Sequence, residues 1–180
     1  MDGSEAPQPR SPYIRSRGLR IPKHPELTTG RIRGALREGT YERKECDAVA
    51  KVVREGDTVL ELGGGIGYMS TLLSVKKKVA RVVTYEANPT LIPYIHSVHA
   101  ANEVTNVEVR NALLAPRAGK PVPFYIRKNF LGSSMDGEID KQAIIDTVQI
   151  DKHGISPTLK EVQPNVLVCD IEGAEANLLP

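Results

Sequence analysis

Four glycines crowd the segment Gly63-Gly64-Gly65-Ile66-Gly67, which directly follows the apolar run at residues 58–62. Glycine accepts positive φ angles and lets a ligand come close to the backbone. A helix that begins after the turn would add amide groups without intrahelical partners. A glycine-rich turn between a strand and a helix is typical of a nucleotide-like ligand site. A tight turn with no ligand is the alternative.

Glu61 indicates which ligand the turn would hold, because it lies two positions before the first glycine. A dinucleotide site requires the spacing G-x-G-x-x-G, so that pyrophosphate rests on the helix N-terminus. Neither Gly63 nor Gly65 begins such a pattern, since Tyr68 and Ser70 occupy the third glycine positions. A carboxylate repels pyrophosphate and attracts an ammonium group. S-adenosylmethionine has an ammonium and no phosphate, so it fits this position. The alternative is that Glu61 is a solvent-facing residue at the end of a strand.

Two further polar residues directly follow apolar runs that predict strands. Glu86 comes after the apolar run at residues 81–85, where a carboxylate can accept hydrogen bonds from both ribose hydroxyls. Its alternative role is to cap or favourably charge the next helix. Asn111 follows the run at residues 107–109 and could bind an adenine edge or simply form a turn.

A carboxylate-rich segment, Asp170-Ile171-Glu172-Gly173-Ala174-Glu175, closes the last apolar run. Asp170 or Glu172 could take a proton from a substrate hydroxyl, provided that it lies within hydrogen-bonding reach of the attacking atom. Oxygen ligation of a divalent cation is conceivable, but no further ligand set accompanies it. The alternative is that these acids stabilise the N-terminus of a helix.

The histidine and cysteine patterns predict no metal site. His96 and His99 have a spacing that permits both to bind a metal ion from one face of a helix, but the sequence indicates no third ligand. Cys46 and Cys169 are the only cysteines, too few for a disulfide framework, so a reducing cytoplasmic setting is expected.

These polar residues require a sheet that brings strand ends together. Short apolar runs at residues 58–62, 81–85, 107–109 and 166–169 predict core strands. Helical patterns fall between them and before them, over about residues 40–56, 66–75 and 88–103. Residues 120–130 and 143–150 predict an antiparallel hairpin with a loop at 132–137. The alternation predicts an α/β fold with a mostly parallel sheet and helices on both faces, and ligands bind at the carboxyl ends of such strands.

The N-terminal segment differs in composition from the rest of the 180-residue chain. Residues 1–33 carry seven basic and three acidic side chains and several prolines, which predicts a flexible basic arm. Residues 34–180 would then form one cofactor-binding domain. Apolar residues make up 40% of the chain, charged residues 26%, and the net charge is +2, so neither a membrane protein nor a nucleic-acid surface is indicated.

Several blocks together resemble the FkbM-type S-adenosylmethionine-dependent methyltransferases. They are GTYE (39–42), VLELGGGIGYMS (59–70), VVTYEANP (82–89) and VLVCDIEGAE (166–175). The resemblance covers roughly residues 35–180 and implies a Rossmann-like class I methyltransferase fold. It also implies methyl transfer from S-adenosylmethionine to an oxygen, on a small-molecule or sugar hydroxyl.

The resemblance also implies a role for each matching position. The predicted cofactor-binding residues are Glu61, Gly63, Gly65 and Gly67 for the methionine part, Glu86 and Ala87 for the ribose, Asn111 and Ala112 near adenine, and Tyr41 on a helix that covers the cofactor. Asp170 and Glu172 would face the transferring methyl group as catalytic residues. No metal is expected.

The resemblance implies a fold with a seven-stranded sheet. This sequence ends just after its fourth main strand, so the C-terminal strands are expected to be missing. Two alternatives to an enzyme of this kind stay open: a module that binds a nucleoside or partner without turnover, and a nicotinamide-dependent oxidoreductase. The expected partners are a small-molecule acceptor and a second copy of the chain, with no nucleic acid and no membrane.

Overall fold

The computed structural model of the chain describes residues 11–127, 143–171 and 178. Its centre is a parallel sheet with the strand order β5-β4-β3-β9. The strands are β3 (Thr58–Leu62), β4 (Arg81–Tyr85), β5 (Val107–Arg110) and β9 (Val166–Cys169). The apolar runs of the sequence predicted all four, because a strand that is buried on both faces has few polar positions.

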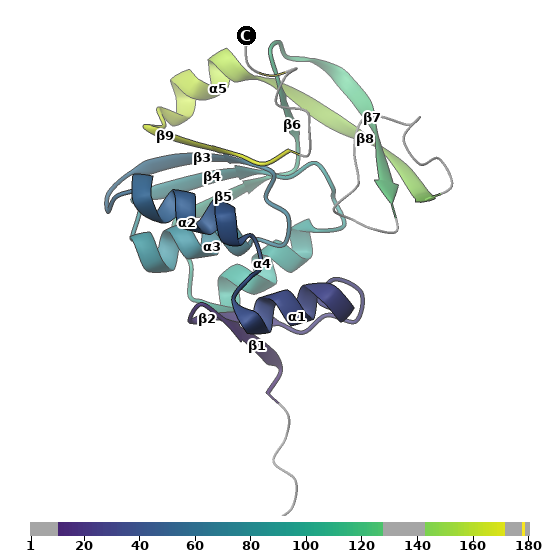
Figure 1. Ribbon diagram of the computed structural model, residues 1–180. Coiled ribbons are helices and arrows are strands. Elements are labelled where there is room, and N and C mark those ends of the chain that lie inside the picture. Colours follow the sequence, from purple (N-terminus) through teal and green to yellow (C-terminus); the bar gives the residue numbers. More distant parts are fainter. Residues whose placement is uncertain (1–10, 128–142, 172–177, 179–180) are drawn as a thin grey trace, which may run out of the picture.

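Helices cover both faces of this sheet, as the sequence predicted (Figure 1). One face carries α2 (Arg43–Val52), α3 (Tyr68–Leu72) with the π-helical turn η1 (Leu73–Lys77), and α4 (Ile92–Ala101), and the other carries α5 (Ile155–Val162). Val59 and Val82 belong to the first core, and their strand neighbours Leu60 and Val83 to the second. Within the described ranges, no helix is long and apolar enough to cross a membrane.

A smaller sheet continues from the carboxyl end of β5. It contains β6 (Leu113–Ala115), β7 (Gly119–Arg127) and β8 (Ile144–Gly154), in the order β6-β8-β7. Strands β7 and β8 pair antiparallel, which confirms the predicted hairpin insertion. The loop predicted at 132–137 lies outside the described residues. The architecture is therefore the α/β, Rossmann-like arrangement that the sequence indicated, with a hairpin added.

The N-terminal segment is ordered where the structure describes it, so the expectation of a flexible arm is wrong for residues 11–33. This segment forms the hairpin β1 (Tyr13–Ser16) and β2 (Leu19–Pro22) and the first turn of α1 (Gly30–Glu38). The inner face of the hairpin places Ile14, Leu19 and Ile21 in the first core, where they are at most 3% exposed. Alternating single apolar residues, rather than a long apolar run, provide this burial. The domain boundary at residue 34 stays a prediction.

The hairpin turn explains why composition misled the sequence analysis. Arg17 and Gly18 both have positive φ angles (47° and 79°), as in the tight turns that match the twist of a two-stranded sheet. Such turns favour Asn-Gly, and arginine at the first position is an unusual signal. Here its guanidinium is held by the Gly39 carbonyl at 3.1 Å and by the Asp47 carboxylate at 3.0 Å.

Candidate active site

The glycine loop is fixed between two neighbouring strand ends. The backbone amides of Gly63 and Gly64 both donate to the Tyr85 carbonyl at the end of β4, each at 3.0 Å. Gly63 has a φ of 91°, and a Cβ atom there would lie 1.9 Å from the carbonyl oxygen of Asp170. Only glycine fits this approach, which brings the predicted loop against the end of β9.

Gly65 has space beside it. Its φ is 52°, and a Cβ atom at this position would meet no atom of the described residues within 4 Å. The loop is therefore packed at Gly63 and open at Gly65, so that a ligand can approach the backbone there. The sequence analysis placed both residues in the cofactor site, and the structure brings them into one loop.

Glu61 is the most unusual group at this site. It is 1% exposed, and neither of its carboxylate oxygens has a hydrogen-bond partner in the described part of the chain. The nearby buried Thr84 hydroxyl has no partner there either. Burial raises the pKa of Glu61 to about 8. A buried carboxyl without partners is costly, so this side chain is suited to a cationic ligand that supplies the missing hydrogen bonds.

Glu86 has the opposite surroundings, although it is also buried. Its Oε2 accepts a hydrogen bond from the Gly65 amide and its Oε1 one from the Asn88 amide, both at 2.7 Å. Burial raises the pKa of this carboxyl. The side chain therefore braces the glycine loop. Each carboxylate oxygen keeps a second acceptor site, which leaves capacity for ribose hydroxyls.

Glu42 is a site residue that the sequence analysis did not single out. It is half-buried, immediately precedes α2, and has a left-handed φ of 45°, which is strained for a residue other than glycine. Burial raises its pKa to about 7, and the charge of Asp170 contributes in the same direction. Its position beside Glu61 and Asp170 results from tertiary packing, so no spacing in the sequence marks it.

These acidic residues share one cavity of about 320 Å³. Glu42, Glu61, Gly63 and Asp170 line it together with apolar side chains of α2 and β9. Asp170 is exposed and directly follows β9, and its backbone amide donates to the Leu62 carbonyl at 2.9 Å. The predicted residues Glu61, Gly63 and Asp170 therefore meet at one place, whereas Glu172 lies outside the described residues.

Three other predicted cofactor residues are already engaged in holding the fold. The side-chain nitrogen Nδ2 of Asn111 donates to the backbone carbonyls of Glu86 (2.8 Å) and Ala87 (3.2 Å), so it secures the turn after β4. Ala87 packs against the smaller sheet, and Ala112 is buried in the second core. Their roles toward a cofactor stay predictions.

Tyr41 is not on a helix, so that detail of the sequence analysis is wrong. It lies in the turn between α1 and α2, because Gly39 ends α1 in a left-handed conformation. The residue is 7% exposed, its ring contacts Tyr68 edge to face with centroids 5.2 Å apart, and burial raises its pKa. Its hydroxyl has no hydrogen-bond partner in the described ranges.

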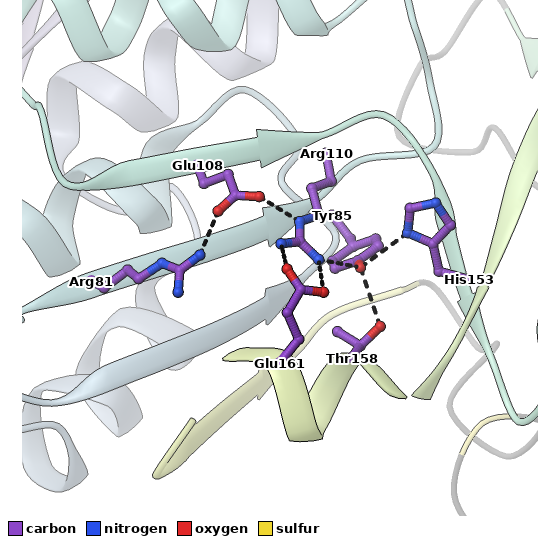
Figure 2. A network of polar contacts seen from close by, with 7 residues as sticks. All are labelled: Arg81, Tyr85, Glu108, Arg110, His153, Thr158 and Glu161. Carbon is purple, nitrogen blue, oxygen red and sulfur yellow. Dashed lines mark hydrogen bonds and ion pairs between the residues drawn. The ribbon is translucent and has the colours of Figure 1, made fainter. Parts of the chain in front are cut away.

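A network of satisfied polar groups lies at the other side of the β4 end (Figure 2). The Tyr85 hydroxyl is 3.1 Å from Nδ1 of His153, 3.3 Å from Oγ1 of Thr158 and 3.1 Å from a guanidinium nitrogen of Arg110. Arg110 also pairs with Glu108 and Glu161. These contacts join β4 and β5 to β8 and α5, so the network ties the smaller sheet to the central one.

The described residues contain no group of three potential metal ligands. His99 is buried, with Nε2 at 3.0 Å from the Ser70 hydroxyl, and burial lowers its pKa to about 4. A neutral, buried histidine with a hydroxyl partner is a structural group.

Comparison with known proteins places this site in a class. Residues 39–113, which include the glycine loop, Glu42 and Glu86, match the family model of the TRM5/TYW2 methyltransferase domain. This segment is therefore similar to an S-adenosylmethionine-dependent methyltransferase domain. No curated protein matches the chain.

Solved structures resemble parts of the chain. Trm5b from Pyrococcus abyssi is 23% identical over 57% of this chain, with a TM-score of 0.43, and TYW2 from M. jannaschii, in complex with AdoMet, is 21% identical over 53%, with a TM-score of 0.42. A putative transferase from Pyrococcus horikoshii is 20% identical over 56%, with a TM-score of 0.38. The chain spans 30%, 40% and 37% of the lengths of these three proteins.

The comparisons correct three expectations drawn from the sequence. The class I methyltransferase fold is confirmed, but neither the FkbM resemblance nor small-molecule O-methylation is supported. The expectation of no nucleic-acid partner is wrong, because the family whose model matches residues 39–113 methylates tRNA. A net charge near zero misled here because it averages over surfaces of different sign. The cytoplasmic setting stays a prediction.

Proposed function

We propose that this chain is the cofactor-binding part of a tRNA methyltransferase. The observation that carries the proposal is Glu61, a buried carboxyl to which the described residues offer no hydrogen bond, beside an open glycine loop. The match of residues 39–113 to the TRM5/TYW2 methyltransferase domain supports tRNA as the acceptor.

The residues present fit S-adenosylmethionine. Glu61 would accept hydrogen bonds from the ammonium of the methionine part, and the open side of Gly65 leaves room for the chain that leads to the sulfonium. Glu86 would accept from the ribose hydroxyls with its remaining lone pairs, while it keeps its bonds to the loop amides. An ammonium beside Glu61 favours the ionised carboxyl, so binding at neutral pH would release a proton.

When bound, S-adenosylmethionine supplies a methyl carbon that is electrophilic because it is attached to a positive sulfur. This carbon would be the group that passes to an acceptor atom of tRNA, with the sulfur as the leaving group. The protein must hold the acceptor in line and remove its proton.

Glu42 is suited to remove that proton. It lines the cavity with Glu61 and Asp170, and its pKa of about 7 allows it to act as a base near neutral pH. Asp170, exposed at the end of β9, would orient the acceptor and keep the pKa of Glu42 high through its charge. Glu172 stays a candidate by its position in the sequence.

Transfer of labelled methyl groups from S-adenosylmethionine to unmodified tRNA tests the proposal. We expect labelled tRNA with the wild-type chain and a rate that rises with pH through about 7, because Glu42 must be ionised. Glu42→Gln should lower kcat at least about 100-fold and flatten the pH profile while cofactor affinity is kept. Glu45→Gln, an exposed neighbour on the same cavity, is the matched control. Cofactor binding without transfer to any tRNA would refute the proposed function.

A further inference from the structure

The hairpin β1–β2 has a buried inner face and a basic outer face. Ile14 and Ile21 pair across the strands on the inner face, and Arg15 and Arg20 pair on the outer one. Two like charges directly opposite each other destabilise a strand pair. The hairpin therefore carries an electrostatic cost that its own fold does not explain.

The charges around these two arginines do not neutralise them. Within the described ranges, Arg15 is exposed and no hydrogen bond or ion pair of its side chain is found. Arg20 contacts Glu103 at 2.9 Å, but that carboxylate is 84% exposed, so the pair is weak. Residues 11–44 hold nine basic and three acidic side chains, whereas the whole chain has a net charge of only +2. The positive charge is therefore concentrated on the N-terminal hairpin and the helices next to it.

An aromatic ring lies on the same outer face. Tyr13 alternates with the buried Ile14 and is 36% exposed, and it pairs with Pro22 next to the Arg15–Arg20 pair. An exposed aromatic ring beside two guanidinium groups can bind single-stranded nucleic acid, since bases stack on the ring and phosphates contact the arginines.

The hairpin is firmly connected to the candidate active site. Arg17 in its turn binds the Gly39 carbonyl, and Gly39 leads through Tyr41 into Glu42. On the other strand, the Pro22 carbonyl accepts from the Tyr94 hydroxyl of α4 at 2.6 Å. A ligand on the outer face would thus be held at a fixed position relative to the site.

We infer that the outer face of the β1–β2 hairpin, formed by Tyr13, Arg15 and Arg20, binds an unpaired segment of the tRNA. The inference rests on the proposed function for the identity of the nucleic acid. Arg15 and Arg20 contact phosphates, which relieves the repulsion between them, and Tyr13 stacks on a base.

Binding of labelled tRNA by the full chain, in the presence of S-adenosylhomocysteine and over a range of salt concentrations, tests this inference. The variant R15Q/R20Q should bind tRNA at least about tenfold more weakly. The slope of the logarithm of its binding constant against the logarithm of the salt concentration should be smaller in magnitude by about 1.5, because two phosphate contacts are lost. R54Q/R117Q removes two exposed arginines elsewhere and should change the affinity less than about threefold. Y13A should lose about tenfold, whereas Y13F should bind like the wild type.

The outcomes separate this inference from the proposed function. Equal tRNA affinity of R15Q/R20Q and R54Q/R117Q would overturn the hairpin assignment. Binding of the same variants to phosphatidylserine vesicles is measured in parallel. If R15Q/R20Q loses vesicle binding but keeps its tRNA affinity, the assignment to tRNA is also overturned. S-adenosylhomocysteine affinity and thermal unfolding serve as controls for folding in every variant. Tight, hairpin-dependent tRNA binding without methyl transfer would instead refute the proposed function and leave the hairpin assignment standing.

Discussion

The two sides of the glycine loop treat buried polar groups in opposite ways. On the side of β9, Glu61 is buried with no hydrogen-bond partner in the described residues. On the side of β5, the Tyr85 hydroxyl has three polar neighbours, one of which is Arg110 (Figure 2). Both groups lie at the carboxyl ends of neighbouring strands but on opposite faces of the sheet, because Glu61 alternates with Leu60 and Leu62 of the second core, to which Tyr85 belongs.

The difference separates a site from its support. A polar group whose hydrogen bonds are complete stabilises the fold and has little left to offer a ligand. A buried group without partners destabilises the free protein and gains most when a ligand arrives.

Gly63→Ala should have the largest effect on stability. A Cβ atom at this position would lie 1.9 Å from the Asp170 carbonyl oxygen, at a φ of 91°. We expect a loss of at least about 3 kcal/mol in the free energy of unfolding, or no folded protein. Gly56→Ala is the control, because its φ of 84° is similar and no atom in the described part of the chain lies within 4 Å of its Cβ position. That variant should lose only about 1 kcal/mol by chemical denaturation. Equal losses would mean that the close approach is unimportant.

Glu61→Gln should weaken cofactor binding yet stabilise the free protein. The folded pKa of about 8 lies above the usual value of 4.5, so the free protein loses stability as pH rises from about 4.5 to 8. The amide cannot ionise, and the variant should exceed the wild type at pH 8 by at least about 1 kcal/mol, with a smaller difference at pH 5. Cofactor affinity should fall at least about tenfold by calorimetry. A variant that is less stable at pH 8 and binds cofactor normally would contradict the role given to Glu61.

Tyr85→Phe should give the reverse pattern. It removes the hydroxyl at the centre of the network but keeps the Tyr85 backbone carbonyl that holds Gly63 and Gly64. We expect a loss of about 1–2 kcal/mol in stability, because the buried Thr158 hydroxyl loses a partner. Cofactor affinity should stay within about threefold of the wild type, since no bond to the glycine loop is lost. If the free energy of cofactor binding falls by more than the free energy of unfolding, the network belongs to the site.

Arg81→Gln should have the smallest effect. Its guanidinium lies 2.6 Å from the Glu108 carboxylate, but both side chains are 42% exposed. Solvent-exposed ion pairs contribute about 0–1 kcal/mol and are screened by salt. Unfolding in low and high salt should show a difference below about 0.5 kcal/mol that decreases as salt is added. A difference that salt does not change would show that the pair acts by packing.

The sequence predicted the parts of this protein that depend on local chemistry. The four core strands follow from short apolar runs, and the glycine loop follows from its position between a strand and a helix. The sequence did not predict α5. It did not predict the N-terminal hairpin either, because prolines and basic residues obscured the alternating apolar positions Ile14, Leu19 and Ile21. It also grouped Glu61 with Glu86, although the structure gives the two carboxyls opposite environments.

Residue type and spacing alone determined that this chain forms an α/β sheet with an acidic, glycine-rich turn suited to an ammonium-bearing cofactor. Tertiary packing, by contrast, brings Glu42 to the cavity that Glu61 and Asp170 also line. The physical reason is that pKa and charge repulsion depend on distances between residues far apart in the chain, and packing sets those distances.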